Sequence, residues 1–212
     1  MTPNISQSIK SVKLLAVGIF SLLSLSLNAA NPLSSLPSGS YSLDKSHASV
    51  IWTVSHLGLS QYVARFTDFD IQLSLDTEKI ENSKVSATVN PASVSTEDKK
   101  FDKDLAGKGW FKSETFPVIT FTSSSYEALT DKTGKLRGSI NMLGVSKPVE
   151  FDVSIGGTVD DHPFIANAAA VGFSASTVIK RSDWGFSKFV PTVGDDVTLT
   201  ITAEFFKKQD NQ

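Results

Sequence analysis

The chain has 212 residues, with 40% hydrophobic and 20% charged side chains and a formal net charge of −2. This length suits one domain, or two small ones, with an ample hydrophobic core. The composition excludes a disordered chain, a collagen-like repeat and a small disulfide-rich domain. Because there is no cysteine, thiol catalysis, thiolate zinc sites and iron–sulfur clusters are excluded. The near balance of charges argues against a nucleic-acid-binding protein, which usually carries a basic excess.

Residues 1–30 have the pattern of a cleaved signal peptide. Two lysines precede an apolar run from Leu14 to Leu27, which is followed by the small residues Ala29 and Ala30. The run has about 14 residues, whereas a membrane-spanning helix needs about 20, so an uncleaved anchor is the weaker alternative. We therefore expect cleavage after residue 29 or 30, and a periplasmic protein with no membrane span in its mature part.

The expected mature chain is one domain with short flanking segments. Residues 31–40 are rich in Ser, Pro and Gly, which is typical of a flexible leader. Residues 41–207 carry the strand patterns, and residues 208–212 are expected to form a short C-terminal tail.

Apolar and polar residues alternate with a period of two, as in strands that have one buried face. The clearest segments are Ser49–Val54, Asp68–Leu75, Lys84–Val89 and Asp196–Phe205. Further strands are expected at 118–123, 137–143, 149–155, 166–173 and 177–181, with turn signals at 131–134, 144–148, 156–157 and 194–196.

One segment, Glu97–Gly107, breaks the strand pattern. Phe101 and Leu105 lie four residues apart in a charged stretch, which predicts one short helix over an end of the strands. Strands and helices do not alternate along the chain, so a parallel nucleotide-binding fold is excluded. About eight antiparallel strands give either an up-and-down barrel or a sandwich. A barrel of that size is either filled by its own side chains or holds one slender ligand.

Catalytic motifs are scarce, with no nucleophile elbow, phosphate loop or dinucleotide-binding fingerprint. His47 and His56 fall on opposite faces of one strand and His162 lies in an acidic turn, so no metal site is predicted. His56 shares a face with Trp52 and Val54. It is expected either to bond a backbone carbonyl at the rim or to contact the polar head of a ligand. A catalytic role for it lacks a partner nucleophile.

The segment Arg181–Phe186 is the densest group of chemically special side chains. Arg181 and Asp183 are two positions apart, which is compatible with an ion pair that braces a bend at Gly185. Alternatively, Arg181 binds an anionic head such as a phosphate, while Trp184 stacks at the entrance. The residues alone leave both interpretations open.

A set of short motifs extends in order from Tyr41 to Phe206. They are Asp44-Lys45-Ser46-His47, Val50-x-Trp52-x-Val54-x-His56-Leu57-Gly58, Ser93-Val94-Ser95-Thr96, Asp104-Leu105, Trp110-Phe111, Phe116–Phe121, Gly138–Val149, Arg181-x-Asp183-Trp184-Gly185 and Val193-Gly194-Asp195-x-Val197. Together, these motifs resemble the YceI-like family of polyisoprenoid-binding proteins.

The resemblance implies an all-β, eight-stranded antiparallel, lipocalin-like barrel with one short helix, in a periplasmic or otherwise secreted protein that is often a homodimer. It implies a long isoprenoid or similar amphiphilic lipid inside the barrel, such as a polyprenyl phosphate or a quinone, and no settled enzymatic activity. We therefore expect neither catalytic residues nor a metal, and a small-molecule lipid as the partner. The protein would serve as a carrier, a store or a stress-related sensor.

Apolar side chains on the expected inner faces would contact this lipid, namely Trp52, Val54, Phe69, Ile71, Leu73, Phe121, Ile140, Met142, Phe151, Val153, Phe173, Trp184 and Phe186. His56 and Arg181 are the candidates for the head group. Two alternatives are a lipid-directed hydrolase or isomerase with unidentified catalytic residues, and a ligand-free interaction module whose barrel is filled.

Overall fold

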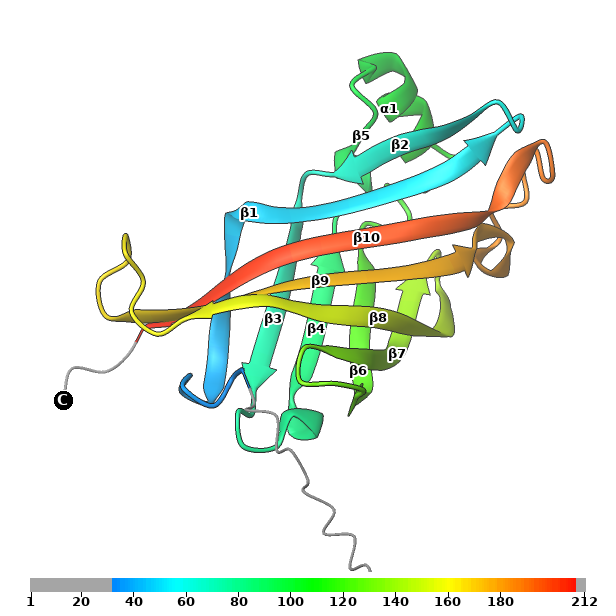
Figure 1. The fold of residues 1–212 in the computed structure, drawn as a ribbon. Helices are drawn as coiled ribbons and strands as arrows, with labels where there is room; N and C mark the ends of the chain where they lie inside the picture. Colours follow the sequence, from blue (N-terminus) through cyan, green and yellow to red (C-terminus); the bar gives the residue numbers. More distant parts are fainter. Residues whose placement is uncertain (1–31, 209–212) are drawn as a thin grey trace, which may run out of the picture.

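The computed structural model describes residues 32–208, which form a closed antiparallel barrel (Figure 1). Eight strands make the ring: β1 (Gly39–His56), β3 (Phe69–Leu75), β4 (Lys84–Val89), β6 (Ile119–Ala128), β7 (Thr133–Met142), β8 (Val145–Val159), β9 (Ala168–Lys180) and β10 (Val193–Lys208). They follow one another in chain order, and β10 pairs with β1 to close the ring. The predicted fold class is therefore confirmed. The expected signal peptide and residues 209–212 of the tail lie outside the described residues.

Two further strands extend the wall at one end of the barrel. The first residues of β1 pair with β3, whereas residues 50–56 pair with β2 (Ser60–Phe66). β2 in turn pairs with the short β5 (Val94–Ser95). The pairing of β1 with β10 shifts in register between Asp44 and Ser49. Such a bulge bends a strand, and it lets β1 follow two neighbours in succession.

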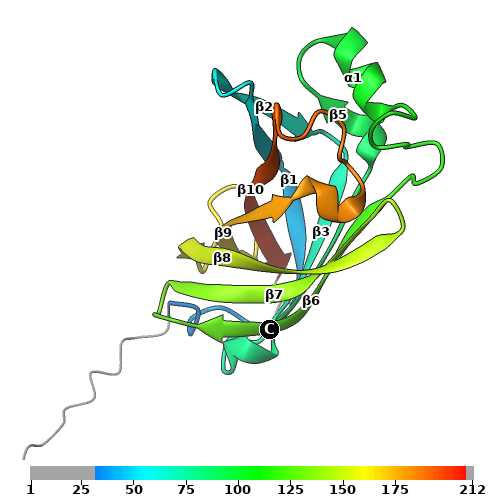
Figure 2. The ribbon, with the colours of Figure 1, turned by 90° about the vertical axis from the view of Figure 1, so that its right-hand side faces the viewer.

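The predicted helix is present as α1 (Lys99–Ala106), at the end of the barrel where β2 and β5 lie (Figures 1 and 2). The Asp98 carboxylate caps it by accepting hydrogen bonds from the backbone N–H groups of Lys100 and Phe101. Gly107 is the C-cap residue of this helix, and Leu105 in its last turn is buried. The described part of the chain also contains three single-turn 3₁₀ helices, η1 (Ile80–Asn82), η2 (Pro91–Ser93) and η3 (Arg181–Trp184).

Three of the predicted turns differ in the structure. Residues 194–196, expected to form a turn, belong to strand β10, and Asp196 pairs there with Lys180 of β9. The turn expected at 144–148 is only the pair Leu143-Gly144, where both residues have positive φ, as a tight hairpin requires. The turn expected at 156–157 is instead a register shift inside β8, between Ile155 and Gly157. Glycine inside a strand often marks a bulge of this kind. The segments expected at 166–173 and 177–181 form one continuous strand, β9.

The opposite end of the barrel is closed by a hydrophobic cluster that includes Leu33, Leu36, Tyr41, Ile155 and Phe205. Leu33 is completely buried and Leu36 is 3% exposed. The Tyr41 hydroxyl donates a hydrogen bond of 2.8 Å to the carbonyl of Pro37, and burial raises its pKa to about 12. The part of the expected leader that is described, residues 32–40, is therefore anchored to the core through Leu33 and Leu36 and is not a flexible segment outside it. Within residues 32–208, no helix has the length and apolar character that crossing a membrane requires.

Candidate ligand-binding cavity

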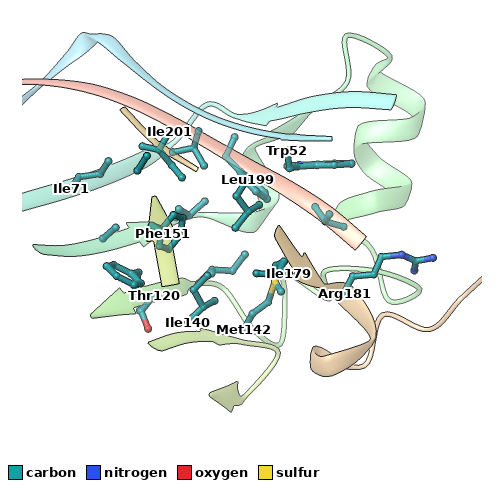
Figure 3. A pocket seen from close by; sticks show the side chains of 18 of the residues that line it. Trp52, Ile71, Thr120, Ile140, Met142, Phe151, Ile179, Arg181, Leu199 and Ile201 are labelled. Carbon is teal, nitrogen blue, oxygen red and sulfur yellow. The ribbon is translucent and has the colours of Figure 1, made fainter. Parts of the chain in front are cut away.

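The barrel encloses a cavity of about 730 Å³, a volume typical of small-molecule binding sites. Figure 3 shows apolar side chains from different strands around this space, among them Ile71, Phe151 and Leu199. Small lining residues such as Ala87 and Ala175 contribute to the unfilled volume. The barrel is therefore hollow, which contradicts the alternative of a filled interior.

Most of the predicted ligand contacts line this cavity. They are Trp52, Val54, Ile71, Leu73, Phe121, Ile140, Met142, Phe151, Val153, Phe173 and Phe186. All of them except Phe186, which follows η3, lie on strands, and the regular alternation of inward and outward side chains along a strand explains why the period-two pattern located these.

Phe69 and Trp184 do not line the cavity, which corrects two of the predicted contacts. Phe69 packs against the cluster at the closed end. Trp184 is 3% exposed, and its Nε1 donates a hydrogen bond of 3.3 Å to the carbonyl of Ile140. It therefore fixes η3 to β7, and it does not stack at an entrance. The strand pattern fails here because β9 ends at Lys180 and the chain continues as a 3₁₀ turn.

The two aromatic pairs Phe121–Phe151 and Phe66–Phe111 pack edge to face, with ring centres 5.4 Å apart in each. The position of Phe121 depends on Gly138 in the neighbouring strand β7. A Cβ atom at residue 138 would lie 2.5 Å from Phe121 Cε2, which is far inside van der Waals contact. The glycine therefore allows the Phe121 ring to lie close against the backbone and leaves the centre of the barrel open.

The mouth of the cavity lies at the α1 end and is built from two segments. The helix and the chain after it contribute Phe101, Trp110 and Phe111, whereas the loop between β9 and β10 contributes Phe186 and Phe189. Phe111 packs edge to face on Phe186 at 5.2 Å, and the ring centres of Trp110 and Phe189 are 6.2 Å apart. These contacts join the two segments over the barrel end.

Arg181 is 7% exposed and is a donor to four backbone carbonyls. Its Nε donates to Gly194 and its Nη1 to Phe186, whereas Nη2 donates to both Lys188 and Val193, all at 2.5–2.9 Å. Four of its five N–H groups are thus engaged, and Figure 3 shows the guanidinium directed away from the apolar side chains. Arg181 therefore holds the 186–194 segment in place through these hydrogen bonds.

The expected ion pair between Arg181 and Asp183 is not among the ion pairs of residues 32–208. The carboxylate that braces this region is Asp195, which accepts hydrogen bonds from the backbone N–H and the hydroxyl of Ser182 at 2.9 and 2.7 Å. Desolvation opposes ionisation of Asp195, but these hydrogen bonds and the nearby Lys180 lower its pKa overall.

His56 lies at the end of β1, exposed at the cavity mouth. Across residues 32–208, its ring has no hydrogen bond to a hydroxyl or carboxylate, so no catalytic pair is formed there. A second polar group at the mouth, Lys188, was not predicted from the sequence. Its Nζ lies 5.1 Å from the centre of the Trp110 ring and 4.9 Å from that of Phe189, distances typical of cation–π contacts. The sequence signal that could have identified Lys188 is its position as a lone lysine within the otherwise uncharged segment 185–192.

A potential metal-binding group, which was not predicted from the sequence, lies away from the cavity. Asp44, His47 and Glu204 bring one ligand atom each within 4.8 Å of one another. Asp44 Oδ2 and His47 Nδ1 are 2.9 Å apart. Hydrogen bonds from Ser46 and His47 lower the pKa of Asp44 to about 2, and the Asp44 carboxylate raises the pKa of His47.

Comparisons with known proteins agree with this architecture. A curated protein from Pseudomonas putida, described as a UPF0312 protein, is 34% identical over 171 residues, which cover 80% of this chain and 87% of the relative. The crystal structure of the Campylobacter jejuni YCEI protein superposes with a TM-score of 0.66 at 33% identity, over 73% of this chain and 90% of that one. A polyisoprenoid-binding domain from Saccharophagus degradans shares the fold, with a TM-score of 0.56 at 14% identity over 78% and 97% of the two chains.

The family model described as the YceI-like domain matches residues 41–205. This range contains the ordered motifs, nearly all of the ring of strands and the mouth segments. The chain therefore belongs to the YceI-like domain family.

Proposed function

We propose that this protein binds a long-chain isoprenoid, or a similar amphiphilic lipid, in the barrel and acts as a periplasmic carrier, store or sensor of that lipid. The observation that carries the proposal is the cavity of about 730 Å³, whose wall is almost entirely apolar. The solved relative of the same fold from Saccharophagus degradans is described as polyisoprenoid-binding, which supports the same class of ligand.

The energetics of burial favour a long apolar chain. Each buried CH₂ group contributes roughly 0.8 kcal/mol, so one five-carbon isoprene unit contributes about 3–4 kcal/mol before losses. Association costs about 4–15 kcal/mol in lost freedom. Several buried units are therefore needed for tight binding, and the affinity comes mainly from the chain. The polar head, for example that of a polyprenyl phosphate or a quinone, would lie at the mouth near Lys188 and His56.

The proposal is tested by extracting the purified protein with organic solvent and analysing the extract by mass spectrometry. We expect a lipid with a long apolar chain. Uptake of a fluorescent apolar probe by lipid-stripped protein provides a second readout. An extract without lipid, together with no uptake of the probe, would contradict the proposal.

A matched pair of variants on β9 links binding to the cavity. Ala175 lines the cavity, whereas the next residue, Ser176, points outward and is exposed. The variant Ala175→Phe places a ring in the cavity and should reduce probe uptake by at least about tenfold, because a ring removes space for several CH₂ groups. The variant Ser176→Phe adds the same side chain outside and should bind as the original protein does. Equal uptake by both variants would place the ligand elsewhere.

A further inference from the structure

Exposed hydrophobic residues gather beside the cavity mouth. Leu57 and Leu59 in the turn between β1 and β2 are 50% and 82% exposed, and Phe189 and Val190 in the β9–β10 loop are 58% and 37% exposed. The backbone N–H of Leu57 donates a hydrogen bond of 2.9 Å to the carbonyl of Thr192, so the two loops are direct neighbours. Figures 1 and 2 show them side by side at this end of the barrel. Contiguous exposed apolar surface is typical of interaction sites.

The loops around the mouth also differ in charge from the rest of the chain. Residues 57–59, 107–113 and 185–192 contain three lysines, Lys108, Lys112 and Lys188, and no acidic residue. All three lysines are exposed. The second and third loops are in contact, since a Cβ at Gly109 would lie 3.7 Å from Lys188 Nζ. The nearest acidic residues along the chain are Asp104, Glu114 and Asp183. Asp104 also lines the cavity, where its carboxylate accepts a hydrogen bond from Trp110 Nε1, and the whole chain has a net charge of −2.

We propose that this mouth surface, formed by residues 57–59, 107–113 and 185–192, docks on an anionic lipid bilayer. The exposed leucines, Phe189 and Val190 would enter the apolar boundary of the bilayer, and the lysines would pair with anionic head groups. Both contributions are known to strengthen the binding of proteins to membrane surfaces. The inference rests on the proposed function, because a lipid that is nearly insoluble in water reaches an apolar cavity most directly from a bilayer in contact with its mouth.

Contacts of the buried residues Arg181 and Phe186 hold part of the mouth surface in a fixed shape. The four hydrogen bonds of Arg181 fix the 186–194 segment, and packing of Phe111 on Phe186 joins it to the α1 side. The loops therefore present their exposed apolar side chains on a preformed support, which lowers the ordering cost of docking.

Single-cysteine labelling tests the docking directly, because the chain has no cysteine of its own. An environment-sensitive fluorophore is attached to the full-length Leu59→Cys variant and, as a control, to Phe164→Cys. Phe164 is 91% exposed in the β8–β9 connection, at the other end of the barrel (Figure 1). With phosphatidylcholine vesicles that contain phosphatidylglycerol, we expect a blue shift at residue 59 and none at residue 164. No shift at residue 59, or equal shifts at both sites, would overturn the proposal.

The charge contribution is tested with the double variant Lys108→Gln/Lys112→Gln. It should weaken vesicle binding by about 25-fold, because each lysine near an anionic surface contributes about a fivefold factor. The control is Lys79→Gln/Lys84→Gln, two exposed lysines toward the closed end, which should bind vesicles as the original protein does. An equal effect of both double variants would contradict a docking site at the mouth and indicate a general dependence on net charge.

A separate measurement distinguishes docking from cavity binding. An apolar fluorescent probe added from ethanol needs no membrane, so its uptake should be unchanged in Leu59→Ser and in Lys108→Gln/Lys112→Gln. Neither these lysines nor Leu59 line the cavity. If the original protein does not take up the probe, the proposed function is contradicted. The vesicle experiment would still test the docking, because it does not depend on probe uptake. Normal uptake without any shift at residue 59 on vesicles would contradict only the docking.

Discussion

The Nζ atom of Lys188 lies 5.1 Å from the centre of the Trp110 ring, and this contact connects the two segments that form the cavity mouth. The Trp110 Nε1 in turn donates a hydrogen bond of 3.2 Å to Asp104 in α1. Within residues 32–208, Lys188 takes part in none of the ion pairs. Its ammonium group is thus held at the mouth by aromatic rings, with its charge available to an anionic head group.

The variant Lys188→Gln should therefore bind a phosphate-headed isoprenoid about 10- to 150-fold more weakly, since a hydrogen bond to a charged group contributes about 1.5–3 kcal/mol. Its affinity for an alcohol with the same chain should change little, because the chain supplies most of the binding energy. Titration of lipid-stripped protein with farnesyl phosphate and with farnesol measures both affinities. Equal losses for the two ligands would exclude a charge-specific role for Lys188.

Arg181 should behave differently, because its guanidinium supports four backbone carbonyls. Replacing it in Arg181→Ala leaves one buried and three partly buried acceptors without their donors, which should lower the free energy of unfolding by about 2–4 kcal/mol. Arg181→Lys should recover only part of this loss, because a single ammonium group cannot reproduce the planar fork. Denaturant unfolding measures the change. If Arg181→Ala is as stable as the original protein and loses affinity only for phosphate-headed ligands, Arg181 binds the head group of the ligand instead of supporting the loop.

Much of the barrel was predictable because inward and outward residues alternate along regular strands. Ile71, Ile140 and Phe151 were placed in the interior by this alternation alone, and all three line the cavity. The pattern ceases to be informative where the strand ends, which is why Trp184 in η3 was misplaced. Leu33 and Leu36 were missed because their surroundings of Ser, Pro and Gly suggested an unpacked leader, although burial of both closes the barrel.

The polar part of the site was less predictable, because contacts across loops leave no periodic signal. The four acceptors of Arg181 lie 5–13 residues away in the sequence, and no local pattern pairs them with it. Likewise, Lys188 meets Trp110 only because two distant segments fold over the same barrel end. The volume of the cavity depends on the fit of particular side chains, such as Phe121 against Gly138, and not on the strand pattern.

The variant Gly138→Ala should test that fit. The added Cβ would collide with the Phe121 ring and the carbonyl of Thr122, so we expect a loss of about 1–3 kcal/mol in the free energy of unfolding and weaker probe uptake as Phe121 moves inward. The double variant Gly138→Ala/Phe121→Leu should recover part of the lost stability and part of the lost probe uptake. The control Gly157→Ala has open space around its Cβ position. If Gly138→Ala is as stable as that control, the close packing of Phe121 on Gly138 is not a determinant of the cavity.

The contact of His47 with Asp44 on β1 predicts a pH dependence of stability. The Asp44 carboxylate raises the pKa of His47 from 6.5, so this contribution is complete below about pH 6 and is lost as the pH rises through the raised pKa. Hydrogen bonds lower the pKa of Asp44 from 3.8 to about 2, so the contact also weakens as the pH falls from about 4 toward 2. The difference in unfolding free energy between the original protein and His47→Gln should therefore be largest between about pH 4 and 6, and smaller at pH 8. Because both groups are on the surface, the difference should shrink at high salt. Denaturant titrations across this range measure it, and a difference that grows from pH 6 to pH 8 would show that the histidine does not act through its charge.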